Sequence, residues 1–449
     1  MAVDKNLFMY DLAVVAIMKN EGPYIKEWLD YHLLAGVNHF YIYDNESSDN
    51  QKEVLQPYIK AGVVTYIFYP GKARQYEAYF DAIQNYRFFC RYMAFIDGDE
   101  FIFPKNNRSV VEVLDEILSD DEKRAGLVVN WHQFGSNFQE KADLSRGVLE
   151  RFTRRASDKN IPLSPRSGLP AGNAIVKSIL NPRKIHYFFN PHFAIPYLGL
   201  YAVNENGEFR EYHFNNPPTV EKIVINHYGQ KSREEYEKKV ARGAADSVNN
   251  VYEKHPFEHI YNDEVDEEIL KYLEHRKKII LPKSLRKKTF AVEKFPVESE
   301  TARFQRISKA AQKNLLPENL QSVPKDFFKG KLETFLICLA VSEKYKLKFT
   351  TEKETFAEYA LYDISQTLQY HSVNLEDCFL LLSVLPDILK MPYEIKENIR
   401  KLCIDTIPNL VELLRTQTSF RDMAYDWQRI IQIKDLLKML ESFDAYKKK

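Results

Sequence analysis

The sequence predicts an α/β fold with a mostly parallel central sheet, followed by an all-α C-terminal region. Over the first 100 residues, short apolar runs alternate with segments of helical period, the pattern of parallel strands connected by helices. After residue 304 the helical period dominates, and no stretch rich in strand formers is obvious. A basic run at residues 275–289 separates the two parts. We therefore expect an α/β domain at residues 1–285 and a helical domain of unknown role at residues 286–449.

Apolar spacing and helix stops define the individual elements of the first part. Trp28 and Leu29 lie at helical spacing, and Gly36 is a typical stop for that helix. The expected strands are Ala13–Met18, Phe40–Tyr43, Val63–Phe68, Tyr92–Ile96, Leu127–Trp131, Ile175–Leu180 and Lys222–Ile225. The expected helices are Pro23–Ala35, Val54–Ile59, Ala73–Phe89, Val110–Leu118 and Ser232–Arg242.

Composition and charge exclude several classes of protein. The 449 residues carry 63 Lys+Arg and 63 Asp+Glu, so the chain lacks the basic excess of a global nucleic-acid binder. The four cysteines lie far apart without a C-x-x-C pair, which excludes a disulfide scaffold and favours a reducing cytoplasm. The N-terminus is unlike a secretory signal, and no apolar stretch is long enough to span a bilayer. We therefore expect a cytoplasmic protein, either free or held at the inner face of the membrane.

Two carboxylates, Asp97 and Asp99, follow the fourth predicted strand and flank Gly98. A turn at Gly98 would let both approach one bound species. Burying two like charges together is costly unless a cation offsets them. Mg²⁺ or Mn²⁺ with oxygen ligands does so, and it also bridges diphosphate oxygens. This motif therefore predicts a metal-bound nucleoside diphosphate, although a solvated acidic turn or a helix cap has the same sequence.

Further polar residues follow the other strands, where ligands of parallel sheets collect. Asp44 could accept the N3–H of uracil or simply build an Asx turn. Lys19 and Glu21 follow the first strand, and Glu21 could accept ribose hydroxyls or begin the next helix, where an acid suits the dipole. Lys72 and Gln75 begin the third helix, a place suited to phosphate or base contacts.

Several motifs of the first half form a series in a characteristic order. They are Ile17–Glu21, Glu27–His32, Gly36–Val37, Tyr41–Asp49, Phe95–Phe101, Trp131–Ser136, Glu150–Phe152, Lys177–Ile179 and Asn226–Tyr228. The series resembles glycosyltransferase family 92 and the related family-2-like bacterial glycosyltransferases. The resemblance implies a GT-A fold for residues 1–285, a nucleotide-sugar donor that is UDP-linked, a divalent metal (Mn²⁺ or Mg²⁺) and inversion at the anomeric carbon. The helical C-terminal part lies outside it.

The resemblance also implies roles for single residues. By position, Asp97 and Asp99 match the motif that binds metal and diphosphate, and Asp44 matches the carboxylate that reads the nucleoside base. Glu21 lies near the ribose. His227 matches a late histidine that reaches the metal or the diphosphate, and its alternative is a hydrogen bond within a strand.

The acceptor side and the catalytic base have weaker candidates. Trp131 and Phe134 fall where an acceptor sugar would lie, although aromatic residues in strands are often plain core. Lys177 could neutralise the diphosphate or pair with an acid on the sheet. An inverting transfer needs a carboxylate to take the proton of the acceptor hydroxyl, and Glu150 and Asp158 are the candidates.

The sequence leaves the partners and one alternative function open. The basic residues Arg151, Arg154, Arg155 and the run 275–288 are either solvated faces or contacts to anionic lipid or to a lipid-linked acceptor. The expected function is transfer of a sugar to a glycan or lipid-linked acceptor. The alternative is a non-catalytic scaffold with the same fold that acts through its helical half. A haloacid-dehalogenase-like phosphatase or a nucleotidyltransferase would need an acidic first strand or a Gly-rich loop, and neither pattern is present.

Overall fold

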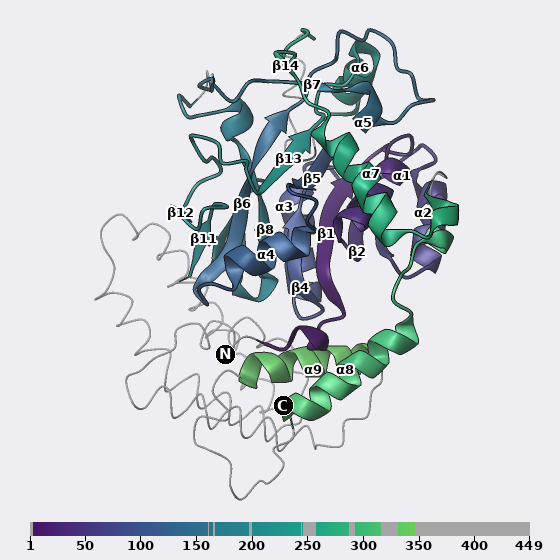
Figure 1. The fold of residues 1–449 in the computed structure, drawn as a ribbon, viewed down its shortest axis with the longest axis vertical. Coiled ribbons are helices and arrows are strands. Elements are labelled where there is room, and N and C mark those ends of the chain that lie inside the picture. The colour runs from purple at the N-terminus through teal and green to yellow at the C-terminus, as the bar shows by residue number, and fades with distance from the viewer. Residues whose placement is uncertain are drawn as a thin grey trace, which may run out of the picture. The chain divides into compact units, whose positions relative to one another are not determined.

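The computed structural model describes residues 3–159, 161–164, 167–196, 200–243, 245, 257–286, 292–315 and 331–345. The chain divides into two compact units (Figure 1). Residues 8–303 form the larger unit, and the described residues 3–7, 304–315 and 331–345 belong to the other. Helices α8 (Glu300–Leu315) and α9 (Lys331–Tyr345) agree with the helical period in that region. Most of the predicted all-α region lies outside the described residues.

Four parallel strands lie next to one another in the order β3 (Val64–Phe68), β2 (His39–Asp44), β1 (Tyr10–Met18) and β4 (Cys90–Phe95). Helices α1 (Ile25–Ala35), α2 (Gln51–Lys60) and α3 (Gln75–Tyr86) connect them, as predicted. The chain passes from β1 to β2 on one side and later returns to β4 on the other side. Such a switch point leaves a crevice beyond the carboxyl ends of the two central strands.

The sheet as a whole is mixed, because parallel and antiparallel pairs both occur beyond these four strands, so the prediction of a mostly parallel sheet is only partly correct. β8 (Val176–Leu180) lies antiparallel between β4 and β6 (Arg124–Gln133). Antiparallel pairing of β8 with its neighbours needs no crossover helix. The described part of this sheet has ten strands, which also include β11 (Tyr201–Val203), β12 (Phe209–Arg210), β13 (Ile223–His227) and β5 (Glu100–Pro104).

The remaining elements surround this sheet. α4 (Val110–Leu118) has the predicted bounds because Ser109 and Glu112 form a capping box at its start. α7 (Glu268–Ile280) packs beside α1, as Figure 1 shows. The others are α5 (Val148–Arg151), α6 (Arg233–Arg242), the pair β7 (Arg154–Arg155) and β14 (Glu264–Val265), the hairpin β9 (Ile185–Asn190) and β10 (Phe193–Pro196), and 3₁₀ turns at Lys5–Leu7, Gly172–Ala174, Pro182–Lys184, Lys283–Leu285 and Val292–Lys294.

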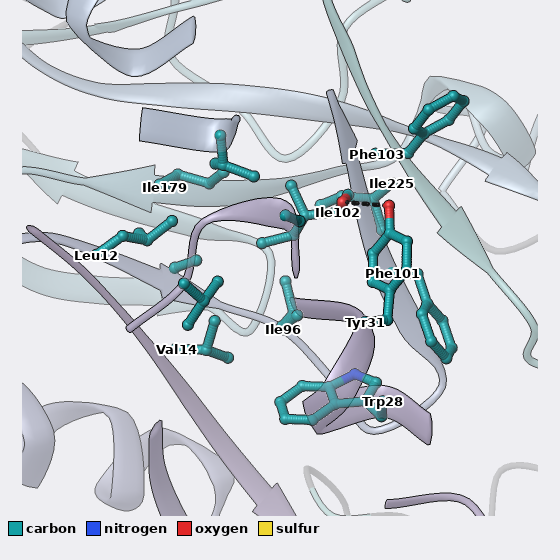
Figure 2. Close-up of a cluster of buried hydrophobic side chains, with 14 of the residues drawn as sticks. Leu12, Val14, Trp28, Tyr31, Ile96, Phe101, Ile102, Phe103, Ile179 and Ile225 are labelled. Atoms are coloured by element: carbon teal, nitrogen blue, oxygen red, sulfur yellow. Dashed lines mark hydrogen bonds between the residues drawn. The ribbon is translucent and has the colours of Figure 1, made fainter. Parts of the chain in front are cut away.

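Strand β5 was not predicted, and α1 anchors its backbone inside the core (Figure 2). Trp28 Nε1 donates to the carbonyl of Glu100 at 2.8 Å, and Tyr31 OH donates to the carbonyl of Ile102 at 2.9 Å. His32 accepts from the N–H of Ile102 at 3.2 Å. The helix thus satisfies backbone groups that burial would otherwise leave unpaired. It thereby holds the chain directly after Asp97 and Asp99 in place.

Buried His32 makes stability sensitive to acid. Burial lowers the pKa of His32 to about 3, below the ~6.5 of an unfolded chain. A depressed histidine pKa contributes stability above pH ~6.5 that is lost as the pH falls, because only the unfolded state then binds the proton. Between pH 7 and pH 5, we expect protonation of His32 in the unfolded state to lower the free energy of unfolding by about 2 kcal/mol. Urea unfolding at both pH values should show a smaller acid loss for His32→Leu than for the wild type. Equal losses in the two proteins would contradict the assignment.

Candidate active site

A cleft of about 810 Å³ lies at the switch point of the sheet. Met18 and Lys19 come from the end of β1, and residues 97–99 come from the end of β4. His227 at the end of β13 and two basic residues of α6 complete the opposite wall. All these residues lie in the larger unit. The cleft therefore lies at the carboxyl ends of the parallel strands, where ligand contacts were predicted.

Asp97 is held by a basic and an amide side chain. Its Oδ2 lies 2.8 Å from Lys177 Nζ, and its Oδ1 accepts from Gln75 Nε2 at 2.7 Å. Gln75 is the first residue of α3 and lines the cleft, as expected, but it bonds an acid of the protein. Glu100 lies behind Asp97 and accepts from its backbone N–H at 2.9 Å.

Charge is balanced around Lys177, which is fully buried on β8. Burial would raise the pKa of Asp97, but the Lys177 ammonium holds it below its usual value. Burial raises the pKa of Glu100 well above its usual range, since one ammonium serves both acids. Lys177 therefore pairs with an acid on the sheet, the second of its two predicted roles, and does not line the cleft.

Asp99 and His227 meet because β5 and β13 pair antiparallel. The ladder places His227 opposite Glu100, and the N–H of Tyr228 continues it to the carbonyl of Asp99 at 2.8 Å. His227 Nε2 consequently lies 3.6 Å from Asp99 Oδ1. Lys239 Nζ lies 2.7 Å from Asp99 Oδ2. Burial would raise the pKa of Asp99, yet Lys239 and His227 hold it well below its usual range.

His227 is a neutral imidazole that packs closely against Gly229 and Trp131. Burial lowers its pKa to about 4. A Cβ at Gly229 would stand 2.8 Å from His227 Nε2, so a larger residue cannot take this position without displacing the ring. The Trp131 ring lies 4.3 Å from the His227 ring and lines the cleft, as the sequence predicted.

A further ion pair lies at the β1 side of the cleft. Glu21 lines the cleft as expected and pairs with Arg242 of α6, which also donates to the carbonyl of Lys19. Lys19, Lys72 and Gly98 line the cleft too. With Lys239 and Arg242, these lysines supply the cleft with cations beside its acids, and an anionic ligand could compete for them.

Three predicted ligand-binding residues are absent from the lining of the cleft. Asp44 is buried, and its carboxylate accepts from Tyr66 OH at 2.5 Å, Gln51 Nε2 at 3.2 Å and the N–H of Ser47 at 3.1 Å. It thus organises the loop after β2, the alternative considered for it. Phe134 packs in the core against Tyr228, and Lys177 is buried as described above.

The two predicted catalytic bases also lie away from the cleft lining. Glu150 on α5 is 58% exposed and pairs with Arg146 at 3.0 Å. Asp158 forms ion pairs with His132 and Arg155. Burial would raise the pKa of Asp158, but the hydrogen bond with His132 outweighs this effect and lowers the pKa to about 2. A salt-bridged carboxylate of such low pKa is a poor proton acceptor at neutral pH. Neither residue fits the role of base.

The prediction that residues 151–155 form a basic surface is wrong for Arg151. Arg151 is buried and makes two hydrogen bonds to Glu235, at 2.9 and 2.8 Å. Arg155 bonds Asp266 at 2.9 Å. These guanidinium groups hold α5, α6 and β7 to their neighbours, so they are not a lipid-contact face. In the part of the chain that the structure describes, no helix combines the length and apolarity needed to cross a bilayer.

The cleft residues that were not predicted from the sequence include His192, Lys239, Arg242 and Glu258. Lys239 and Arg242 are three residues apart on a predicted helix, so they share a face, but the charged helix gave no indication of its neighbour. His192 follows Asn190-Pro191 in a turn, and burial lowers its pKa to about 3. None of these positions has a local motif.

The donor atoms of Asp99 and His227 fit a divalent ion. A carboxylate oxygen and a neutral imidazole nitrogen are both metal ligands, and here they lie 3.6 Å apart in one cleft. Over the described ranges, no cluster of three or more His, Cys, Asp or Glu side chains is arranged to hold a metal by itself. An ion here would therefore need oxygens from a ligand or from water to complete its shell, and it would compete with Lys239.

Comparison with known proteins gives a family match. The sequence profile of glycosyltransferase family 92 matches residues 16–269, more than half of the chain. A family 92 protein of Ricinus communis is 27% identical over 147 residues, which cover 32% of this chain and 26% of that protein. A family 92 protein of Oryza sativa subsp. japonica is 29% identical over 147 residues. The chain thus spans about a quarter of the length of these curated relatives.

This chain is also similar to proteins of named activity and to proteins of solved structure. A galactan β-1,4-galactosyltransferase of Arabidopsis thaliana is 30% identical over 103 residues, which cover 20% of this chain and 21% of that protein. TarS 1–349 of S. aureus, solved in complex with UDP, is 12% identical, covers 85% of this chain and 93% of its own, and has a TM-score of 0.25. Glucosyl-3-phosphoglycerate synthase of Mycobacterium tuberculosis, solved with Mn²⁺ and UDP, is 20% identical with a TM-score of 0.20, over 27% of this chain and 44% of its own. At these TM-scores, the likeness carries no argument about function.

Removing the buried ammonium should be costly. Lys177→Met leaves Asp97 and Glu100 without their shared cation, and breaking a buried pair costs about 3–5 kcal/mol. Lys222→Met is the matched control, since its pair with Glu116 is half exposed and such pairs contribute up to about 1 kcal/mol. Urea unfolding of both variants measures the difference. A loss for Lys177→Met no larger than that of the control would show that the buried pair does not stabilise the fold.

Proposed function

Because the chain belongs to glycosyltransferase family 92, we propose that it transfers a sugar from a nucleotide-sugar donor to a glycan or lipid-linked acceptor. The observation that carries this proposal is the cleft at the β1/β4 switch point. Asp97 and Asp99 share this cleft with Lys19, Lys72 and Lys239. A sugar nucleotide has two negatively charged phosphates, a polar sugar and a base. A polar cleft with fixed cations is suited to bind such a ligand.

Asp99 and His227 are the residues that would hold a divalent ion, with Asp97 beside them. When bound, a Mn²⁺ or Mg²⁺ ion supplies positive charge for the departing diphosphate. The chain itself adds Lys239, whose ammonium pairs with Asp99 at 2.7 Å. In the proposal, Lys239 moves from the carboxylate to a donor phosphate when the donor enters. Neutral His227 keeps a lone pair available for the ion across the physiological pH range because its pKa is about 4.

Glu258 is our candidate for the base that the transfer requires. Among the acids of the cleft, Glu21, Asp97 and Asp99 already have cationic partners, and Glu46 accepts a hydrogen bond from the N–H of Gly71. Glu258 also lines the cleft, and among the described residues no ion pair to its carboxylate is present. We propose that it takes the proton of the acceptor hydroxyl while the anomeric carbon is attacked from the opposite side of the leaving group, which inverts the configuration.

The names of the relatives suggest which donor to test. Two similar Arabidopsis thaliana proteins are galactan β-1,4-galactosyltransferases. A UDP-linked hexose, with UDP-galactose as the leading candidate, is therefore the donor that we propose. The aromatic face of Trp131, beside His227 in the cleft, is suited to pack against a sugar ring.

Donor hydrolysis tests the proposed function without a known acceptor. We expect the wild type, with Mn²⁺, to hydrolyse at least one of a panel of UDP-sugars slowly, and EDTA to stop it. Asp99→Asn keeps the size of the side chain but loses the charge that binds the ion, so we expect at least a 100-fold loss of rate.

UDP should raise the melting temperature of the wild type only with Mn²⁺ or Mg²⁺. Equal shifts with and without metal would contradict the metal role, and no hydrolysis of any donor would contradict the transferase.

The base assignment has its own test. Glu258→Gln removes the proton acceptor while keeping the shape of the side chain, and loss of a general base typically costs about 10²–10⁴-fold in rate. Glu46→Gln is the matched control, because Glu46 lines the same cleft and accepts a hydrogen bond from the N–H of Gly71. Steady-state kinetics should show a loss of kcat for Glu258→Gln with little change in donor KM. Equal kcat values for both variants would exclude Glu258 as the base.

A further inference from the structure

A second hollow lies on the larger unit, outside the cleft. It has a volume of about 490 Å³, and α3 and β9 form its walls. Its lining is rich in aromatic residues, among them Tyr69, Tyr76, Phe80 and Phe188. Tyr76 is 37% exposed and Phe80 is 47% exposed. Large exposed aromatic side chains gathered in a hollow are typical of binding sites.

The floor of this aromatic groove is held rigidly. Phe188 packs against Tyr79 and Phe95, with ring centroids 5.2 and 4.6 Å apart. Tyr69 packs edge-on against Tyr43 at 5.2 Å, and the Arg74 guanidinium lies over the Tyr69 ring. These contacts fix the rings before any ligand arrives. A preformed site loses less conformational entropy on binding.

Polar groups alternate with the rings along α3. Glu77, Asp81 and Gln84 line the groove at spacings of four and three residues, which places them on one helix face. Asp81 is oriented by Tyr43 OH, which donates to its carboxylate at 2.6 Å. Carboxylate and amide oxygens accept hydrogen bonds from hydroxyl groups. The groove thus offers apolar ring faces next to hydroxyl acceptors.

The charge of the groove argues against an anionic occupant. Its ionisable side chains are two acids and one base, and Arg74 is already paired with Glu77. A nucleic acid or an anionic membrane surface would need the opposite balance. A neutral ligand with apolar faces and many hydroxyl groups fits both the rings and the acids, and a carbohydrate chain has this chemistry.

Helix α3 also connects the groove to the cleft. Gln75 and Tyr79 lie on the face that reaches Asp97, at 2.7 and 3.5 Å. Tyr76 and Phe80, each one residue further along, lie on the adjacent face and line the groove. A ligand in the groove is therefore one helix width from the acids of the cleft.

We propose that the aromatic groove binds a neutral oligosaccharide, the acceptor chain or its product, beside the transfer site. The proposal rests on the proposed function for the identity of the ligand as acceptor. Tyr76 and Phe80 stack on sugar rings, and Glu77 and Gln84 accept their hydroxyl groups. An enzyme with such a subsite extends a bound chain, so it binds long acceptors more tightly than single sugars.

The test is binding of the full chain to a microarray of neutral oligosaccharides of increasing length, including β-1,4-galactan oligomers. We expect binding that strengthens with length, and Phe80→Ala and Tyr76→Ala should each weaken it about tenfold, the size of one buried aromatic contact. Phe80→Trp should retain binding, whereas Phe80→Leu should lose it, because stacking needs an aromatic face. Phe209→Ala is the control, since Phe209 is 57% exposed on β12 and lines neither hollow.

Donor hydrolysis and molecular mass, measured on the same variants, separate the possible failures. If the wild type hydrolyses a UDP-sugar but binds no oligosaccharide, or if Phe80→Ala binds like the control, the groove proposal is overturned while the transferase stands. If no donor is hydrolysed but oligosaccharides bind through Phe80, the groove stands without the proposed function. A change of oligomeric state in Phe80→Ala with unchanged oligosaccharide binding would overturn the proposal in favour of contact between two copies of the chain.

Discussion

The antiparallel pairing of β5 with β13 is the constraint on which the candidate site depends. It places His227 opposite Glu100 and continues through the N–H of Tyr228 to Asp99. Helix α1 fixes the same strand from the other side, through Trp28 and Tyr31. Since this pairing determines where the acid and the imidazole meet, a slip of the register by one residue would turn His227 to the other face of the sheet.

Charge pairing is the second organising feature. Each acid that faces the cleft from β1 or β4 has a cation from a distant part of the chain: Lys177 for Asp97, Lys239 for Asp99 and Arg242 for Glu21. Buried acids without such partners would take up protons and lose their charge. Two of the three cations come from α6, so this helix controls the electrostatics of the cleft. An anionic ligand that competes for these cations would change the pairing of charges in the cleft without changing the fold.

The errors of residue assignment have a common cause. Glu150 pairs with Arg146, and Asp158 pairs with His132 and Arg155, so side chains remote from the cleft lining engage both predicted bases. Asp44 lies at the end of β2, as predicted, but its carboxylate accepts hydrogen bonds from Tyr66 and Gln51. A sequence shows which residues are close to a strand end. It does not show which hydrogen-bond partners the neighbouring strands bring.

The sequence by itself determined that the first four strands run parallel and that the acid pair follows the fourth of them, because both follow from local periodicity and from the geometry of strand–helix–strand connections. It also predicted Trp131 and His227 as candidate site residues, through the resemblance of its motifs to the family, and both line the cleft. Only the tertiary structure decided that Lys177 neutralises Asp97, that Lys239 and Arg242 reach the cleft, and that α3 presents an aromatic groove. These contacts join residues up to 221 positions apart, and the free energy of such pairs depends on burial and register, which no local pattern encodes.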